Sequence, residues 1–281
     1  MLHSPENIRV IVYDLDGTVY DDNRHFELYA REIASHLPQD VQEGFWNDYR
    51  AVVDGNHPAL RIGAFYDRER DVVLYTRANQ VTRALRWDGT PIAAEQLRLL
   101  YPGTVEPDHQ RIYNVGDLWW VPSAVSAHYG GDPAKQNEAF LRIRDIMADP
   151  AFTIRPIPGL REVVESLKGR VIQVLATNSP QPDSEAILTK IGLLGHFDQL
   201  FFRSNKPMGL KQIFDALAQT YGIGLNQILS VGDNLVNEIA PAKAMGCQTV
   251  FIDPHQLSEP SDADLIVRNM SELLPVLRSL G

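Results

Sequence analysis

Apolar runs of strand length alternate with amphipathic segments over the second half of the chain. The apolar runs predict β-strands within residues 171–179, 197–204, 227–234 and 247–253. Apolar residues at helical spacing predict helices at residues 158–169, 184–195, 210–222 and 236–246. Strands that alternate with helices are typical of parallel strands joined by crossover helices. The pattern therefore predicts an open α/β sheet.

One further apolar run, residues 8–13, has the composition of the same sheet but stands alone near the N-terminus. Its expected neighbours come only after residues 22–152, a segment with helical patterns near both ends and an aromatic, irregular middle. The run 71–80 within this segment fits a strand or a helix equally. The sequence predicts an α/β core, residues 1–21 and 153–281, interrupted by an inserted, mostly helical domain.

The amino-acid composition limits which partners and which cell compartment the protein can be expected to have. A net charge of −10 disfavours a nucleic-acid or anionic-membrane binder, which would display a basic patch. The single cysteine allows no internal disulfide and favours a reducing compartment. No apolar run approaches the roughly 18 residues of a membrane span, and the N-terminus lacks a signal-like apolar region. We expect a soluble, cytoplasmic protein, and its negative charge leaves a small anionic substrate open, because a few cations and a metal can reverse the sign locally.

Polar residues close each expected strand of the core. They are Asp14, Asp16, Gly17 and Thr18; Thr177, Asn178 and Ser179; Lys206; and Asp233, Asn234 and Glu238. Ligands of open α/β sheets bind at the carboxyl ends of the strands, so we expect these residues to converge. Carboxylate oxygens suit Mg²⁺, and a cation would relieve the repulsion between the acids. A carboxylate beside it can attack phosphorus.

Each cluster alone also has a simpler interpretation. Asp14 to Thr18 fits a polar turn, Thr177 a helix cap and Lys206 a solvated side chain. An EF-hand loop fits poorly, because Val12 stands where such a loop needs its first acid. The position of all four clusters at strand ends of one α/β pattern favours a shared site.

In this order the clusters resemble the four motifs of the haloacid dehalogenase-like (HAD) hydrolase superfamily, in its phosphatase branch. "YDLDGTVY" resembles the first motif, "VLATNS" the second, "NKP" the third and "VGDNLVNEIAPAKAMG" the fourth. The resemblance implies a Rossmann-like core. It also implies that residues 22–152, inserted between motifs one and two, form a cap that selects the substrate.

The resemblance further implies a Mg²⁺-dependent phosphatase. Asp14 would be the nucleophile and a metal ligand, and Asp233 the other carboxylate ligand. Asp16 would bind the metal through its carbonyl and act as acid and then base. Glu238 stands where many members carry aspartate and would support the metal ligands. The phosphoryl group would contact Asp14, Leu15, Asp16, Thr177, Asn178 and Lys206, with Lys211 as an alternative lysine.

The expected substrate is a small phosphorylated metabolite such as a nucleoside monophosphate or a sugar phosphate. "DGTVY" is faintly similar to pyrimidine 5′-nucleotidases. The alternatives are a phosphomutase and a non-catalytic binding protein. Asp16 argues against dehalogenation, because dehalogenases of the superfamily lack it. In the insertion, we expect Trp119 and Trp120 to pack in a core rather than stack on substrate.

Overall fold

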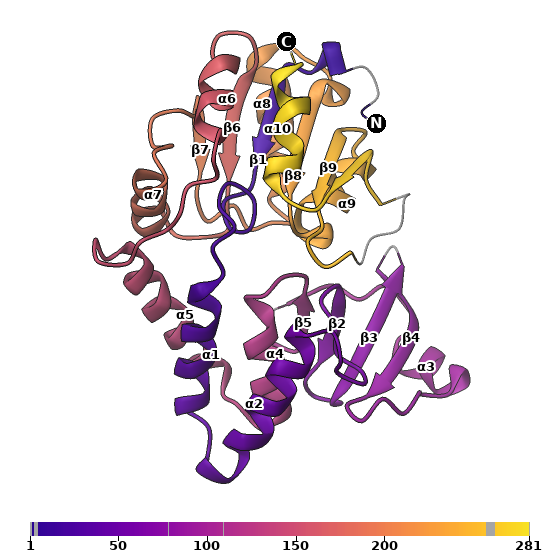
Figure 1. Cartoon of the computed structure of the whole chain (residues 1–281). Helices are drawn as coiled ribbons and strands as arrows, with labels where there is room; N and C mark the ends of the chain where they lie inside the picture. Colours follow the sequence, from indigo (N-terminus) through magenta and orange to yellow (C-terminus); the bar gives the residue numbers. More distant parts are fainter. Residues whose placement is uncertain (1, 3–4, 78, 109, 257–261, 281) are drawn as a thin grey trace. The chain divides into compact units, whose positions relative to one another are not determined.

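The computed structural model describes residues 2, 5–77, 79–108, 110–256 and 262–280 (Figure 1). The chain divides into two compact units, residues 1–22 with 144–281 and residues 23–143. The second unit is thus an insertion into the first. Residues 144–152, which the sequence pattern placed in the insertion, group with the first unit. Over the described ranges, no helix combines the length and apolar character needed to cross a membrane.

A six-stranded parallel sheet, in the order β10-β9-β8-β1-β6-β7, forms the centre of the first unit. Its strands are β1 (Val10–Tyr13), β6 (Ile172–Ala176), β7 (Gln199–Phe201), β8 (Ile228–Gly232), β9 (Gln248–Ile252) and β10 (Leu265–Val267). β1 pairs with β6 on one side and β8 on the other, and all four of its residues are buried. The predicted Rossmann-like sheet is confirmed, and β10 adds an edge strand that the pattern did not indicate.

Helices cover both faces of this sheet, as expected for a parallel sheet. They are α6 (Leu160–Leu167), α7 (Gln181–Lys190), α8 (Leu210–Tyr221), α9 (Ala240–Ala244) and α10 (Met270–Arg278). Phe214 of α8 packs in one hydrophobic cluster with Val10 and Val12 of β1. Gln173 of β6 points to the other face and donates to the carbonyl of Val164 in α6. α6 and α10 pack together there (Figure 1).

The second unit combines helices with a four-stranded antiparallel sheet in the order β4-β3-β2-β5. Its strands are β2 (Ala64–Asp67), β3 (Val72–Arg77), β4 (Gln80–Arg86) and β5 (Ile112–Val115). Its helices are α1 (Arg24–Ser35), α2 (Gln39–Val53), α3 (Ala94–Leu100), α4 (Trp120–His128) and most of α5 (Pro133–Ala148). The prediction of a mostly helical insertion therefore missed a sheet.

Two of these strands lie where the sequence pattern was ambiguous. The run 71–80 contains β3, and the irregular aromatic stretch contains β5. Short strands depend on cross-strand neighbours that are distant in sequence, which local periodicity does not register. Asp67 at the end of β2 shows such a long-range contact, because this fully buried carboxylate accepts a hydrogen bond from Arg111 at 3.0 Å.

Trp119 packs within the second unit. Its ring lies 5.1–5.4 Å, centroid to centroid, from the rings of Phe26, Tyr29 and Phe140. Rings at such spacings in tilted and edge-on arrangements are typical of a hydrophobic core. Trp119 and Trp120 thus both pack against aromatic rings of this unit, Trp120 against Tyr113, but each is half-buried rather than fully enclosed in a core.

The C-terminal end of α5 is fixed within the first unit by α7. Lys190 of α7 donates to the carbonyl oxygens of Met147, Asp149 and Phe152 at 2.5–2.8 Å. The last carbonyls of a helix lack partners within the helix, and a cation there is favourable. This capping explains why residues 144–152 belong with the core, although α5 begins in the insertion.

Candidate active site

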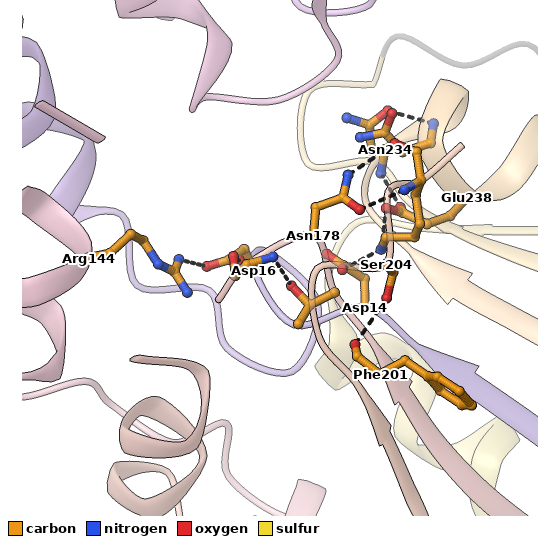
Figure 2. Close-up of polar contacts among 12 residues, drawn as sticks. Asp14, Asp16, Arg144, Asn178, Phe201, Ser204, Asn234 and Glu238 are labelled. Carbon is orange, nitrogen blue, oxygen red and sulfur yellow. Dashed lines mark hydrogen bonds and ion pairs between the residues drawn. The ribbon is translucent and has the colours of Figure 1, made fainter. Parts of the chain in front are cut away.

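A buried charge network lies where the core strands end. β1 leads into Asp14, whose backbone N–H donates to the carbonyl of Val231 on β8 at 3.0 Å. The ammonium of Lys206 lies 2.6 Å from Asp14 Oδ1 and 2.8 Å from Glu238 Oε1. All three side chains are at most 10% exposed. Residues from three distant segments of the chain thus share one ion-pair network (Figure 2).

The second motif positions the lysine. The side-chain amide of Asn178 donates to the carbonyl of Lys206 at 3.0 Å and accepts from its N–H at 2.7 Å. The preceding residue, Thr177, is buried, and its N–H donates to the carbonyl of Phe201 on β7 at 2.9 Å. Its Oγ1 accepts from the N–H of Ser179 at 3.1 Å. These bonds fix the loop that carries Lys206 against the end of the sheet.

Lys211, the alternative lysine, lies elsewhere. It is exposed on α8 and pairs with Asp215 one turn further along the helix, at 2.6 Å. Lys206 is instead buried between two carboxylates. The geometry therefore selects Lys206 as the lysine of the cluster.

The chain after β8 turns Glu238 back toward the strand ends. A π-helix over Leu235–Ile239 begins at Asn234, whose side chain accepts from two backbone N–H groups of its first turn. Glu238 Oε2 accepts from the N–H of Asn234 at 3.1 Å. A Cβ on Gly232 would lie 2.3 Å from Glu238 Oε2, so this approach requires glycine.

Three carboxylates are close enough to share a cation. Asp14, Asp233 and Glu238 each bring an oxygen within 4.8 Å of the others. Asp233 reaches this position over Gly17, where a Cβ would lie 2.0 Å from Asp233 Oδ2 and where φ is +73°. Both oxygens of Glu238 already accept hydrogen bonds, which suits a supporting position. This donor set fits a hard divalent cation such as Mg²⁺.

Burial and mutual charge shift the pKa values of the ion-paired residues. Burial raises the pKa of Asp14 to about 7, although the ammonium of Lys206 acts in the opposite direction. Burial acts to lower the pKa of Lys206, but the charges of Asp14 and Glu238 outweigh it and hold that pKa above its usual range. The lysine is therefore cationic at neutral pH. A cation bound to the carboxylates would act in the same direction as Lys206 and lower the pKa of Asp14 from this raised value.

Asp16 is held by three side chains. Its Oδ1 accepts from Arg144 Nη1 at 2.6 Å and from the hydroxyl of Tyr20, and its Oδ2 accepts from Ser179 Oγ at 2.9 Å. Figure 2 shows Arg144 and Asp16 facing each other, with Asn178 on the far side of Asp16 from Arg144. Burial acts to raise the pKa of Asp16, but Arg144 and the other donors hold that pKa below its usual range.

A sequence model of haloacid dehalogenase-like hydrolases matches residues 8–246. The match begins before β1 and ends after α9, so it includes all four strand-end clusters. The chain belongs to the haloacid dehalogenase-like hydrolases. The family resemblance of the motifs is thereby confirmed. No curated protein matches the sequence.

Solved structures include proteins with the same fold. The putative HAD-hydrolase YfnB from Bacillus subtilis, bound to magnesium, is 16% identical, with 96% of this chain and 98% of that chain covered and a TM-score of 0.52. A HAD phosphatase from Thermococcus onnurineus (16% identity, 97% and 99% covered) and an L-2-haloacid dehalogenase (17%, 97% and 99%) each give 0.49. At this identity, the likeness to YfnB shows the fold alone.

In this haloacid dehalogenase-like hydrolase, the motifs located the charged cluster but not the contacts around Asp16. Tyr20 and Ser179 lie inside the first and second motifs, so a local signal existed for them. Arg144 lies in the segment that the pattern assigned to the insertion, outside every motif. Only the fold shows that α5 returns this arginine to the core.

Proposed function

We propose that the chain is a Mg²⁺-dependent phosphomonoesterase that acts through a phosphorylated Asp14. The observation that carries this proposal is Asp16, a second carboxylate held beside the nucleophile by Arg144, Tyr20 and Ser179. Dehalogenation needs no acid at this position. Phosphoryl transfer does, because the leaving alcohol has to be protonated.

The reaction follows from two carboxylates with different tasks. Against the effect of burial, Arg144 holds the pKa of Asp16 low in the free protein, so Asp16 takes up its proton when the negatively charged phosphoryl group binds beside it. An oxygen of Asp14 then attacks phosphorus, the ester P–O bond breaks, and protonated Asp16 gives its proton to the leaving oxygen. Water then attacks phosphorus, Asp16 takes one of its protons, and the P–O bond to Asp14 breaks to release inorganic phosphate. The second step returns a proton to Asp16 and frees the carboxylate of Asp14, so both residues are ready for the next turnover.

The surrounding residues supply charge and position. Lys206 offsets the charge of Asp14 before attack and the charge of the phosphoryl oxygens during transfer. Thr177 and the backbone N–H groups of Leu15 and Asn178 are assigned to bind phosphoryl oxygens. Asp14, Asp233 and the carbonyl of Asp16 would hold Mg²⁺, with Glu238 behind them. When bound, the ion neutralises charge on the phosphoryl group.

The proposed substrate is a small phosphorylated metabolite, with nucleoside monophosphates and sugar phosphates as the leading classes. The unit over residues 23–143 is proposed to select it, because it is inserted directly after the first motif. Lys206, Thr177 and the backbone N–H groups of the candidate site would hold only the phosphoryl end. Selectivity for the rest of the molecule is therefore assigned to the inserted unit.

Hydrolysis of p-nitrophenyl phosphate tests the proposed function. We expect release of p-nitrophenol with Mg²⁺, loss of nearly all activity after EDTA treatment, and recovery when Mg²⁺ is restored, because the clustered carboxylates need a cation. A 2-haloacid incubated in parallel should release no halide. If folded protein hydrolyses neither this ester nor a broad panel of phosphorylated metabolites, the proposal is wrong. Transfer of phosphate between positions of one sugar would indicate a mutase instead.

A further inference from the structure

Arg144 forms a bridge between two carboxylates of the first unit. Its Nη1 lies 2.6 Å from Asp16 Oδ1, and its Nε donates to Asp183 Oδ2 on α7. The guanidinium is almost completely buried, and Asp183 is 5% exposed. Arginine presents its donors in a planar fork, so two fixed partners define the orientation of the whole group.

Asp183 is a rigid anchor for this bridge. It lies in the first turn of α7, where the helix dipole favours a negative charge. The other end of α7 caps the carbonyls that follow Arg144, through Lys190. The two ends of one helix thus hold both the side chain of Arg144 and the backbone that follows it.

We infer that Arg144 is a positioning residue that fixes the carboxylate of Asp16 for proton transfer. The inference rests on the proposed function, in which Asp16 is the acid and base. Arg144 and Tyr20 both donate to Oδ1, and Ser179 donates to Oδ2. Oδ2 is therefore assigned to carry the exchanged proton, because a serine hydroxyl can reverse from donor to acceptor when that oxygen is protonated.

If Arg144 only stabilised the fold, its replacement would have a different kinetic effect from the one expected of a positioning residue. Loss of structure would slow every substrate alike. Displacement of the Asp16 carboxylate would slow hydrolysis most for substrates with a basic leaving group, because that group depends most on being protonated as it departs. Phenyl phosphate and p-nitrophenyl phosphate allow this comparison. They have nearly the same shape, but phenolate is a much more basic leaving group than p-nitrophenolate.

The test measures kcat/KM for both esters with Mg²⁺ in the wild type, Arg144→Lys and Asp183→Asn. We expect Arg144→Lys to lose about tenfold or more with phenyl phosphate and distinctly less with p-nitrophenyl phosphate, because a displaced acid forfeits part of its contribution. Asp183→Asn should change the ratio in the same direction by less. Arg142→Lys, an exposed neighbour on α5, is the matched control and should leave both values unchanged.

Circular dichroism and thermal unfolding check that each variant is folded. Asp183→Asn preserves side-chain volume and remains the test if Arg144→Lys unfolds. Equal losses with both esters in a folded variant, or no loss in either variant, would overturn the inference. A wild type that hydrolyses neither these esters nor a broad panel of phosphorylated metabolites would instead refute the proposed function.

Discussion

The Asp14→Asn variant is expected to hydrolyse phosphate monoesters at least about 10⁴-fold more slowly than the wild type. The amide that replaces the carboxylate is a poor nucleophile, and the network loses one of its two negative charges. Position and charge neutralisation by Lys206 and the cation cannot replace the missing nucleophile. The measurement is kcat/KM for p-nitrophenyl phosphate with saturating Mg²⁺.

The fold of this variant is expected to survive. Burial raises the pKa of Asp14 to about 7, which means that the buried charged form destabilises the folded state. A neutral amide of the same shape removes this destabilisation. Asp215→Asn, which removes an exposed carboxylate from α8, is the matched control and should retain full activity. Retention of more than about a hundredth of the wild-type rate in folded Asp14→Asn would exclude Asp14 as nucleophile.

The Lys206→Met variant is expected to lose both activity and stability. Methionine has a similar length, but it leaves Asp14 and Glu238 buried without their shared ammonium. Removing one partner of a buried ion pair typically costs about 3–5 kcal/mol. Activity should fall about 10²- to 10³-fold, because the charge of the phosphoryl group is less well neutralised.

The stability loss of Lys206→Met should grow with pH. Asp14 titrates near its ordinary pKa of 3.8 in the unfolded chain, and in the folded variant its pKa would lie above the wild-type value of about 7. Between these values the folded state holds a proton that the unfolded state has released, so stability falls as pH rises. In the wild type this fall ends near pH 7, whereas in the variant it continues, so the deficit of the variant grows above about pH 7. Urea unfolding in EDTA should show a larger deficit at about pH 8 than at about pH 6.

Lys211→Met is the matched control for Lys206→Met. It removes an exposed lysine that pairs with a carboxylate on the same helix, so we expect wild-type activity and a stability change within about 0.5 kcal/mol. If both variants behave alike, Lys206 has no special role.

The fold of the core was predictable because its signals are local. Each apolar run is followed by polar or glycine residues and then by a helical pattern, which is the signature of strands alternating with helices. The sheet of the insertion was not predictable in this way. β3 pairs with β2 and β4, and β2 pairs with β5, which lies far along the chain, so their stability comes from pairing rather than from local periodicity.

The same contrast holds for the site. Asp14, Asp233 and Lys206 stand at strand ends, and the rule that ligands bind there was enough to propose that they converge. Glu238 lies in one carboxylate cluster with Asp14 and Asp233, and its contacts with Lys206 and Asn234 required the structure. Arg144 could not be found from the sequence, because a lone arginine in an amphipathic helix has the pattern of a surface residue.

The central claim is that Asp14 becomes phosphorylated during turnover, and chemical trapping tests it most directly. Protein turning over p-nitrophenyl phosphate with Mg²⁺ is quenched in acid and reduced with borohydride, which converts an acyl phosphate to an alcohol but leaves free carboxylates intact. Peptide mass spectrometry then locates the reduced residue. The account predicts reduction at Asp14 only when substrate and Mg²⁺ are present. Turnover with Asp14 unmodified, or with another residue reduced in its place, would contradict it.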